Sequence, residues 1–315
     1  MSIKSTTRAQ PINGEPTVIP AEPGSYGVQP PRYRLPSTTR LGRVRLQVAA
    51  LERSLMFYRD LLGFDVLEHS QGRATLGAHG ADTPCIELHE YAGAKLIPRH
   101  GRLGLYHFAV LLPERAALGR LVAHLERAGA YPGMSDHLVS EALYLRDPDG
   151  LGVEVYADRP RSLWRRSGRE LVMKTDRLEV ASLLREAGTT PWAGMPAGTT
   201  IGHVHLHVGD LDAAAAFYHE ALGFDAVVWS YPGALFLSAG GYHHHLGLNT
   251  WAAGAPPSQK DEAKLLDWEI ILPGAADADA AASSLQAQGY GVTQTDGVWS
   301  ATDPWGTTVK INGET

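Results

Sequence analysis

The stretch GRVRLQV at residues 42–48 recurs as GHVHLHV at residues 202–208. The match continues along the chain, because Leu51 and the segment LGFD at 62–65 return as Leu211 and LGFD at 222–225. Between them, the pair FY at 57–58 returns at 217–218. Self-similarity at a fixed offset indicates an internal duplication, so one structural unit is written twice.

Each copy of the repeated stretch predicts a strand followed by a helix. Residues 42–48 and 202–208 alternate in polarity as a half-buried strand does, and the Phe-Tyr pair lies on the apolar face of an amphipathic helix that ends at a glycine. A second pair of matches, LP and DPDG at 112–113 and 147–150 with LP and DPWG at 272–273 and 303–306, follows further strands. We predict helices over about 114–129 and 275–289, and hence four βαβββ modules in an α+β fold with curved mixed sheets.

The modules group into two domains. We predict the first at residues 41–157 and the second at 200–315, which agrees with a length of 315 residues at roughly 100–200 residues per domain. Residues 1–40 are rich in Pro, Gly, Ser and Thr and predict an arm, with ordered structure beginning near Leu41. Residues 158–199 predict a linker with a basic stretch and a short helix near 177–187.

Charge and hydropathy exclude several classes of partner. Lys and Arg number 28 and Asp and Glu 34, a net charge of -6, and no stretch concentrates the positive charge that nucleic acids require. No apolar run of about 18 residues could span a membrane, and the first twenty residues lack the apolar core of a secretory signal. We therefore expect a cytoplasmic protein that binds neither nucleic acid nor membrane.

The chain has 14 histidines and one cysteine. Cys85 alone cannot form an internal disulfide or a cysteine-based zinc site. A metal in this protein would therefore be bound by imidazole and carboxylate groups.

The four modules resemble those of the vicinal oxygen chelate superfamily, which includes glyoxalase I, bleomycin-resistance proteins and extradiol dioxygenases. The segment from His137 through YLRDPDG at 144–150 to Glu154 resembles the extradiol dioxygenase signature, although Ser135 departs from it. With SEALY at 140–144 and GYHHH at 241–245, the chain is most similar to the two-domain bacterial catechol 2,3-dioxygenase group. The fold alone hosts several chemistries.

The resemblance implies where metal ligands lie, because each module of the superfamily offers one position on its first strand and one on its last. In chain order these positions are Arg43 and Glu87, His107 and Glu154, His203 and Gly247, and Asp267 (or Trp268) and Lys310. If the two modules of each domain shared a cup, His203 would face Lys310, and Arg43 would oppose a cation beside His107 and Glu154. Glu87 would then be an additional carboxylate.

Pairing the second module with the third, as some two-domain relatives do, combines His107, Glu154 and His203. This is a 2-His-1-carboxylate set, and the pairing moves Arg43 and Lys310 into the other cup. We prefer this arrangement. Glu154 lies between Val153 and Val155, where an unpaired buried carboxylate would be costly. Strand alternation also places residues 203, 205 and 207, all histidines, on one face.

Three facial ligands leave room for Fe(II), with Mn(II) as the alternative, to bind both oxygens of a catechol together with O₂. The resemblance implies that Tyr144 hydrogen-bonds a substrate oxygen and that His137 orients substrate or oxygen. It favours His244 as the acid–base residue, whereas strand alternation with Gly247 favours His245, and an exposed histidine rim is a third reading.

These features predict an Fe(II)-dependent extradiol dioxygenase that acts on a small aromatic diol with O₂. A glyoxalase-like metal-dependent isomerase or lyase is the alternative, although Gly247 removes a fourth protein ligand. A third reading is a non-catalytic binding protein with a cup lined by aromatic side chains, namely Trp229, Tyr231, Trp251 and Trp268. Exposed sheet edges leave a homo-oligomer open.

Overall fold

The computed structural model describes residues 17–314. The first sixteen residues of the predicted arm lie outside this range. From residue 17 the chain is already ordered against the rest of the protein, so the expectation that ordered structure begins near Leu41 is wrong. Tyr26 and Leu35 are buried, and the Arg34 guanidinium forms a salt bridge with Asp225. An apolar residue every few positions is enough to fix this segment on the surface without periodic structure.

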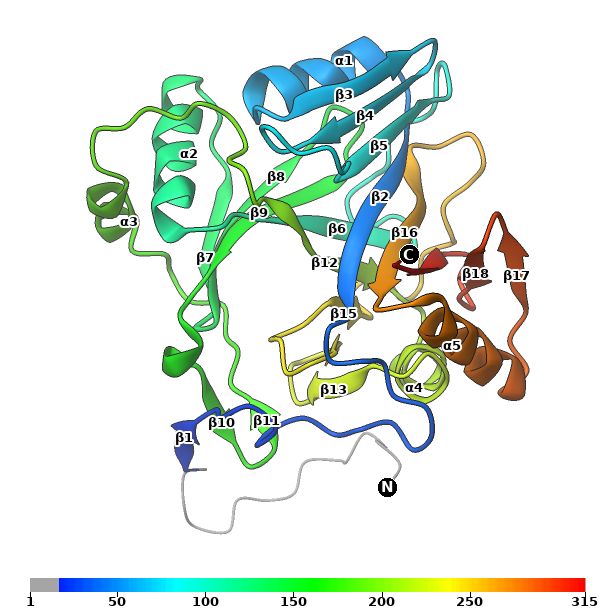
Figure 1. Cartoon of the computed structure of the whole chain (residues 1–315). Helices are drawn as coiled ribbons and strands as arrows, with labels where there is room; N and C mark the ends of the chain where they lie inside the picture. The colour runs from blue at the N-terminus through cyan, green and yellow to red at the C-terminus, as the bar shows by residue number, and fades with distance from the viewer. Residues whose placement is uncertain (1–16, 315) are drawn as a thin grey trace.

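Four βαβββ modules form the body of the protein, which confirms the predicted α+β fold (Figure 1). Module one comprises β2 (Arg40–Val48), α1 (Leu51–Leu55), η1 (Met56–Leu61), β3 (Asp65–Ser70), β4 (Arg73–Gly77) and β5 (Ile86–Glu90). Module two comprises β6 (Gly104–Leu111), α2 (Arg115–Arg127), β7 (Gly133–Asp136), β8 (Ser140–Arg146) and β9 (Gly152–Asp158). Module three comprises β12 (Thr200–His207), α4 (Leu211–Ala215), η3 (Ala216–Ala221), β13 (Asp225–Val228), β14 (Ala234–Ser238) and β15 (Leu246–Asn249). Module four comprises β16 (Lys264–Leu272), α5 (Ala275–Ala287), β17 (Val292–Thr295), β18 (Val298–Thr302) and β19 (Thr308–Gly313).

The strands form two eight-stranded sheets, and each sheet takes strands from both halves of the chain. One has the order β13-β14-β15-β12-β6-β9-β8-β7, which joins module three to module two. The other has the order β17-β18-β19-β16-β2-β5-β4-β3, which joins module four to module one. The seams are the antiparallel pairs β12–β6 and β16–β2. The preferred pairing of modules two and three is therefore confirmed.

The apolar residues of the repeated strands point toward the helices, as their alternation predicts. Val44 and Leu46 on β2, like Val204 and Leu206 on β12, are almost completely buried in the core between sheet and helix. Burial of such side chains contributes about 1.5–3 kcal/mol each. The opposite face of each sheet is thus left to line a cup.

A repeated tyrosine links the two modules of each half. The hydroxyl of Tyr58 donates to Oδ2 of Asp147 at 3.0 Å, and the hydroxyl of Tyr218 donates to Oδ2 of Asp303 at 2.9 Å. Both tyrosines belong to the Phe-Tyr pairs and lie in the π-helical turns η1 and η3. The repeated Phe-Tyr pair therefore holds the Asp-Pro turn of the neighbouring module through a hydrogen bond.

The cup of modules one and four is occupied by its own ion pairs. Arg45 contacts Asp267 at 2.9 Å, Arg43 approaches Glu87 at 3.4 Å, and Lys310 donates to Oγ of Ser300 at 2.8 Å. Cationic groups stand at two of its four ligand positions. Mutual pairing satisfies these charges without a metal.

The linker contributes two strands, a 3₁₀ turn and a helix. A three-stranded sheet contains β1 (Val18–Pro20), β10 (Arg165–Ser167) and β11 (Glu170–Leu171), and residues 161–163 form the 3₁₀ turn η2 (Arg161–Leu163). The predicted short helix is α3 (Val180–Ala187), which packs on α2 (Figure 1). The linker is thus a structured part of the wall beside the cup.

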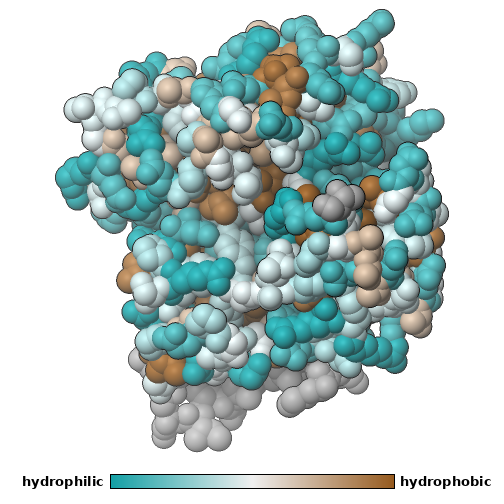
Figure 2. All heavy atoms as spheres, in the orientation of Figure 1, coloured by the Kyte–Doolittle hydropathy of each residue, from teal (hydrophilic) through white to brown (hydrophobic). Residues whose placement is uncertain are grey.

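The face of the molecule shown in Figure 2 is mostly hydrophilic, with small separate apolar groups. Among residues 17–314, no helix has the length and apolar character needed to cross a bilayer. Large apolar side chains that are exposed include Tyr131, at 84%.

Candidate metal centre and active site

Two of the proposed ligands lie on the strands that flank β6, one on each side of a small residue of that strand. On β6, Ala109 lies opposite Glu154 of β9 on one side and opposite His203 of β12 on the other. Because the alanine side chain ends at Cβ, the longer side chains of Glu154 and His203 can meet above it. His107 is two residues before Ala109, so it points to the same face.

The three side chains converge to hydrogen-bonding distance. Oε2 of Glu154 lies 2.9 Å from Nε2 of His107 and 3.1 Å from Nε2 of His203. One ligand atom from each of these residues lies within 4.8 Å of the others, and all three residues are buried. Two imidazoles and one carboxylate thus converge on one point.

The electrostatics favour the protonation states that a metal requires. Burial opposes ionisation of Glu154, but the facing His203 and His107 outweigh it and hold the pKa of that carboxyl well below its usual range. Burial lowers the pKa of His107 and of His203, although Glu154 opposes this. A carboxylate and neutral imidazoles are the forms that bind cations.

Two buried nitrogens of this cluster have no hydrogen-bond partner among the described residues. They are Nε2 of His107, which is near Glu154 but is not directed along a hydrogen bond to it, and Nδ1 of His203. A buried polar atom without a partner costs about 1–3 kcal/mol. A divalent cation between Nε2 of His107 and Oε2 of Glu154 would relieve this cost at His107, so the residues fit a metal.

A cavity of about 850 Å³ opens in front of the cluster. His107, Glu154 and His203 form its floor, and aromatic side chains form much of its wall. The wall residues that the sequence did not point to include Phe57, Arg99, Tyr106, Tyr131, Arg146, Met173, Lys174, Thr175 and Phe236. Residues 173–175 belong to the linker, whose packing no local pattern reveals. Tyr106, beside His107, could have been suspected from its neighbour.

Tyr144 and His137 lie together on one side of the cavity. The hydroxyl of Tyr144 is 2.7 Å from Nε2 of His137, and Nδ1 of His137 donates to the carbonyl of Lys174 at 2.6 Å. Since a carbonyl only accepts, Nδ1 of His137 bears a proton. In the neutral ring Nε2 then accepts a hydrogen bond from the hydroxyl of Tyr144. Burial, reinforced by the charge of Glu154, raises the pKa of Tyr144 well above its usual value. The phenol therefore stays protonated.

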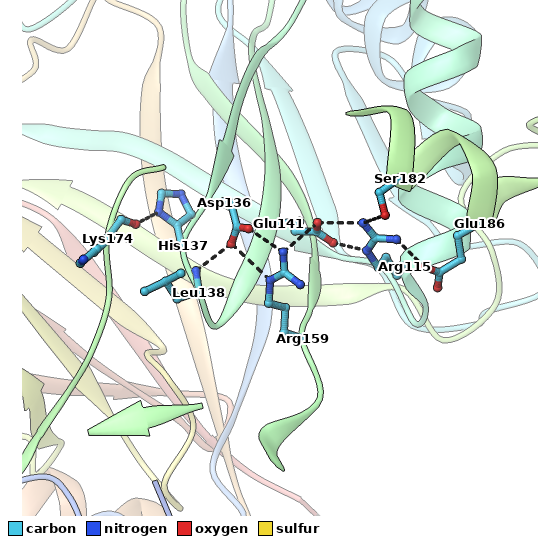
Figure 3. Close-up of polar contacts among 9 residues, drawn as sticks. All are labelled: Arg115, Asp136, His137, Leu138, Glu141, Arg159, Lys174, Ser182 and Glu186. Carbon is cyan, nitrogen blue, oxygen red and sulfur yellow. Dashed lines mark hydrogen bonds and ion pairs between the residues drawn. The ribbon is translucent and has the colours of Figure 1, made fainter. Parts of the chain in front are cut away.

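A polar network behind His137 fixes the loop that carries it (Figure 3). Arg159 bridges Asp136, at 2.5 Å, and the buried Glu141, at 3.1 Å. Glu141 in turn accepts from Arg115 of α2 at 3.0 Å. Leu138, next to His137, has φ of 68°, a strained value for a branched side chain, and its amide donates to Oδ1 of Asp136. The network stabilises this conformation.

The consecutive histidines separate into different environments. His244 lines the cavity, with its ring 4.1 Å from that of His203. His245 points away from the cavity and accepts at Nδ1 from the amide of Ala239 at 3.2 Å. Strand alternation does not apply to either residue, because β15 begins only at Leu246. Burial, reinforced by the surrounding histidines, lowers the pKa of His244 well below its usual value. None of the three forms an exposed rim, since all are buried.

Gly247 offers no side chain at the fourth expected ligand position, and the ring of His205 lies beside it. A Cβ on Gly247 would lie 2.8 Å from Cγ of His205, so the imidazole of His205 fills the space that a side chain at 247 would need. His205 lines the cavity opposite His107, and its Nε2 has no partner among the described residues. His207 is bonded instead to Oδ1 of Asn249 at 2.6 Å.

Two of the aromatic residues that were predicted to line the cup do so, and two do not. Tyr231 and Trp251 lie in the cavity wall. Trp268 is fully buried in the core on the other sheet, and Trp229 packs against the core rather than facing the cavity. Trp268 lies on β16, whose sheet belongs to the other cup, so that prediction is corrected.

Comparison with known families and structures gives the same picture. The family model of the glyoxalase/bleomycin resistance protein/dioxygenase superfamily matches residues 40–155 and 200–311. A catechol-2,3-dioxygenase of Bacillus subtilis (strain 168) is 45% identical over 270 residues, which are 84% of this chain and 94% of that protein.

Solved structures agree in fold. A Bacillus subtilis protein described as a candidate dioxygenase superposes with a TM-score of 0.61 at 15% identity, over 89% of this chain and 86% of that one. Glyoxalase I of Zea mays superposes with a TM-score of 0.51 at 18% identity, over 87% of this chain and 92% of that one. At these identities the likeness concerns the fold alone.

Proposed function

Because the chain belongs to the glyoxalase/bleomycin resistance protein/dioxygenase superfamily and is a catechol-2,3-dioxygenase-like enzyme, we propose that it is an Fe(II)-dependent extradiol dioxygenase. Its substrates would be a small aromatic diol and O₂. The observation that carries the proposal is the buried cluster of His107, Glu154 and His203 at the floor of a cavity large enough for an aromatic ring.

His107, Glu154 and His203 would hold the metal, with Mn(II) as the alternative to Fe(II). Bound there, Fe(II) would supply the redox chemistry that joins a diol to O₂. The protein supplies no fourth ligand from Gly247. This feature favours an oxygenase over a glyoxalase-like isomerase, which would use four protein ligands.

The remaining cavity residues would orient the diol and manage its protons. Nε2 of His244, which faces the cavity, is the base that takes a hydroxyl proton from the diol and later returns it. Tyr144 and His137 would hold a substrate oxygen on the other side. Aromatic walls, including Phe236 and Trp251, would clamp the ring and exclude water. His245, which lies outside the cavity, would act through packing and its bond to Ala239.

Oxygen consumption tests the proposed reaction. The protein is purified without oxygen, reconstituted with Fe(II) and mixed with a broad panel of catechols in an oxygen-electrode cell. We expect uptake of one O₂ per diol and a coloured semialdehyde product. Absence of uptake with every catechol would contradict the proposal, and turnover of a substrate without O₂ would favour the isomerase or lyase.

Metal content tests the ligands separately. Glu154→Gln keeps the size of the side chain but loses its charge, so bound iron per chain should fall at least about tenfold, because a neutral amide is a much weaker ligand. Glu87→Gln, in the other cup, is the matched control and should retain iron. Elemental analysis after gel filtration measures both, and loss of iron only in Glu87→Gln would place the metal elsewhere.

A further inference from the structure

A chain of polar contacts runs from His244 away from the cavity toward the surface. Nδ1 of His244 lies 2.7 Å from Nδ1 of His243, and Nε2 of His243 lies 2.9 Å from Oδ1 of Asp158. The side chain of His243 is completely buried, whereas that of Asp158 is 30% exposed. Neither His243 nor Asp158 lines the cavity. Two residues outside the site are thus bonded in series to one inside it.

The chemical nature of each partner fixes where the protons lie when the ring of His243 is neutral. A carboxylate only accepts, so Nε2 of His243 carries a proton and donates it to Asp158. Nδ1 of a neutral His243 is then an acceptor, and Nδ1 of His244 must be the donor in the bond between the two rings. The remaining nitrogen of His244, Nε2, therefore carries a lone pair. It makes no hydrogen bond within the described part of the chain.

The surroundings hold His243 in this orientation. The ring of Tyr242 lies 4.1 Å from that of His243, and the rings of Trp164 and Tyr156 pack on it at 5.5 and 5.9 Å. The hydroxyl of Tyr242 also donates to Oδ1 of Asp158 at 3.1 Å. A ring enclosed in this way cannot turn to exchange its nitrogens without displacing its neighbours.

We propose that Asp158 and His243 are positioning residues that fix the tautomer of His244, so that its cavity-facing nitrogen is always the unprotonated one. A base with the opposite tautomer would present an N–H to the diol and could not accept its proton. This inference rests on the proposed function insofar as His244 takes a substrate proton. The tautomer itself can be measured without any reaction.

Nitrogen NMR of histidine-labelled, metal-free protein reads the tautomer directly, with the His244 signals assigned by their loss in His244→Asn. We expect an unprotonated Nε2 and a proton-bearing Nδ1. In Asp158→Ala the two signals should move toward values averaged over both tautomers. Tyr242→Phe is the matched control, since it removes the other hydrogen bond to the same carboxylate oxygen and should leave His244 unchanged.

Kinetics of the iron-loaded protein gives a second readout. Asp158→Ala and His243→Phe should each lower kcat by about 10- to 100-fold, which is less than the roughly 10²- to 10⁴-fold that a general base contributes as a whole, and leave KM and bound iron unchanged. Because both act through His244, the double variant should be no slower than His243→Phe. Additive losses, or a change confined to KM, would contradict a positioning role.

The NMR result separates this inference from the proposed reaction. A protonated Nε2 on His244 in the unsubstituted protein, or unchanged His244 signals in Asp158→Ala, would overturn the tautomer assignment whatever the activity. If the signals follow expectation while no catechol consumes oxygen, the tautomer assignment stands and the proposed reaction fails.

Discussion

Asp147 shows how a single buried group couples stability to pH. Its Oδ1 accepts from the amides of Asp149 and Leu151, and its Oδ2 accepts from Tyr58. Burial is the main cause that raises the pKa of Asp147 to about 7, and the neighbouring Asp149 adds to it against the hydrogen bonds. An unfolded aspartate would lose its proton near pH 4.

The sign of the effect follows from the raised pKa. Between about pH 4 and pH 7 the unfolded chain releases this proton while the folded chain keeps it, so stability from this group falls as pH rises through that window. The shift of about three units corresponds to about 4 kcal/mol. Above pH 7 both the folded and the unfolded chain have lost the proton, so the decrease in stability from this group is complete.

Asp147→Asn tests this directly, since an amide keeps an oxygen for the two backbone donors and offers an N–H to Tyr58. We expect the free energy of unfolding of the variant, measured with urea, to increase by a few kcal/mol relative to that of the wild type as the pH rises from 4 to 8. Asp60→Asn, an exposed carboxylate, is the control and should track the wild type. A constant difference between Asp147→Asn and the wild type across this range would refute the raised pKa.

At the scale of elements, the cluster of His107, Glu154 and His203 depends on a small residue on the middle strand, which lies between two of its members. Ala109 lies between Glu154 and His203 across β9, β6 and β12 and is completely buried. Any larger side chain there would occupy the space in which the carboxylate and the imidazole meet. The equivalent position on β16, Glu269, pairs with Lys310 and faces a cup that holds ion pairs instead.

Ala109→Val should therefore abolish iron binding while the protein still folds. Overpacking of this kind costs about 1–3 kcal/mol, within the stability of an ordinary domain. Val110→Ile, which adds bulk to the opposite face of the same strand, is the control and should lower Tm comparably but keep its iron. Full iron content in a folded Ala109→Val variant would show that the two ligands do not need this space.

The sequence was sufficient for the four modules because strand alternation, the Phe-Tyr helix and the Asp-Pro turn are local signals, and duplication repeats them. The pairing of modules two and three was implied by the resemblance to two-domain relatives, and the charges at the ligand positions favoured it. The resemblance favoured His244 over His245, whereas strand alternation favoured His245 and was misleading because both residues precede β15. The contact of Asp158 with His243 joins residues from different halves of the chain, so neither position alone suggests it.

At the scale of the molecule, the two halves of the chain are held together by the sheets rather than by the linker. Strands β6 and β12 form one seam and β2 and β16 the other, so each half completes both sheets of the other (Figure 1). Separating the halves would expose four strand edges and their apolar faces. The covalent link runs through residues 188–190, which are all exposed. Its main effect is to raise the effective concentration of each half of the chain for association with the other.

A site-specific protease sequence inserted after Gly188 tests this. After cleavage we expect the halves to coelute as one particle on gel filtration and to retain iron, with a Tm that now depends on protein concentration. The uncut insertion variant is the control. Separate elution of the two halves at micromolar concentration would contradict this account. Either half expressed alone should bind no iron at this site, because neither contains His107, Glu154 and His203 together.

The exchanged pairing of modules also bears on how the protein arose. Two identical half-length chains would make the same two sheets by pairing the second module of each with the first module of the other, and such a dimer would have two equal sites. Joining two such copies into one chain would make the two sites independent of each other, so that one could keep its ligands without the other. Arg43 and Lys310 stand in one cup at the positions that correspond to His203 and Glu154 in the other, so the two cups of this chain are chemically unequal.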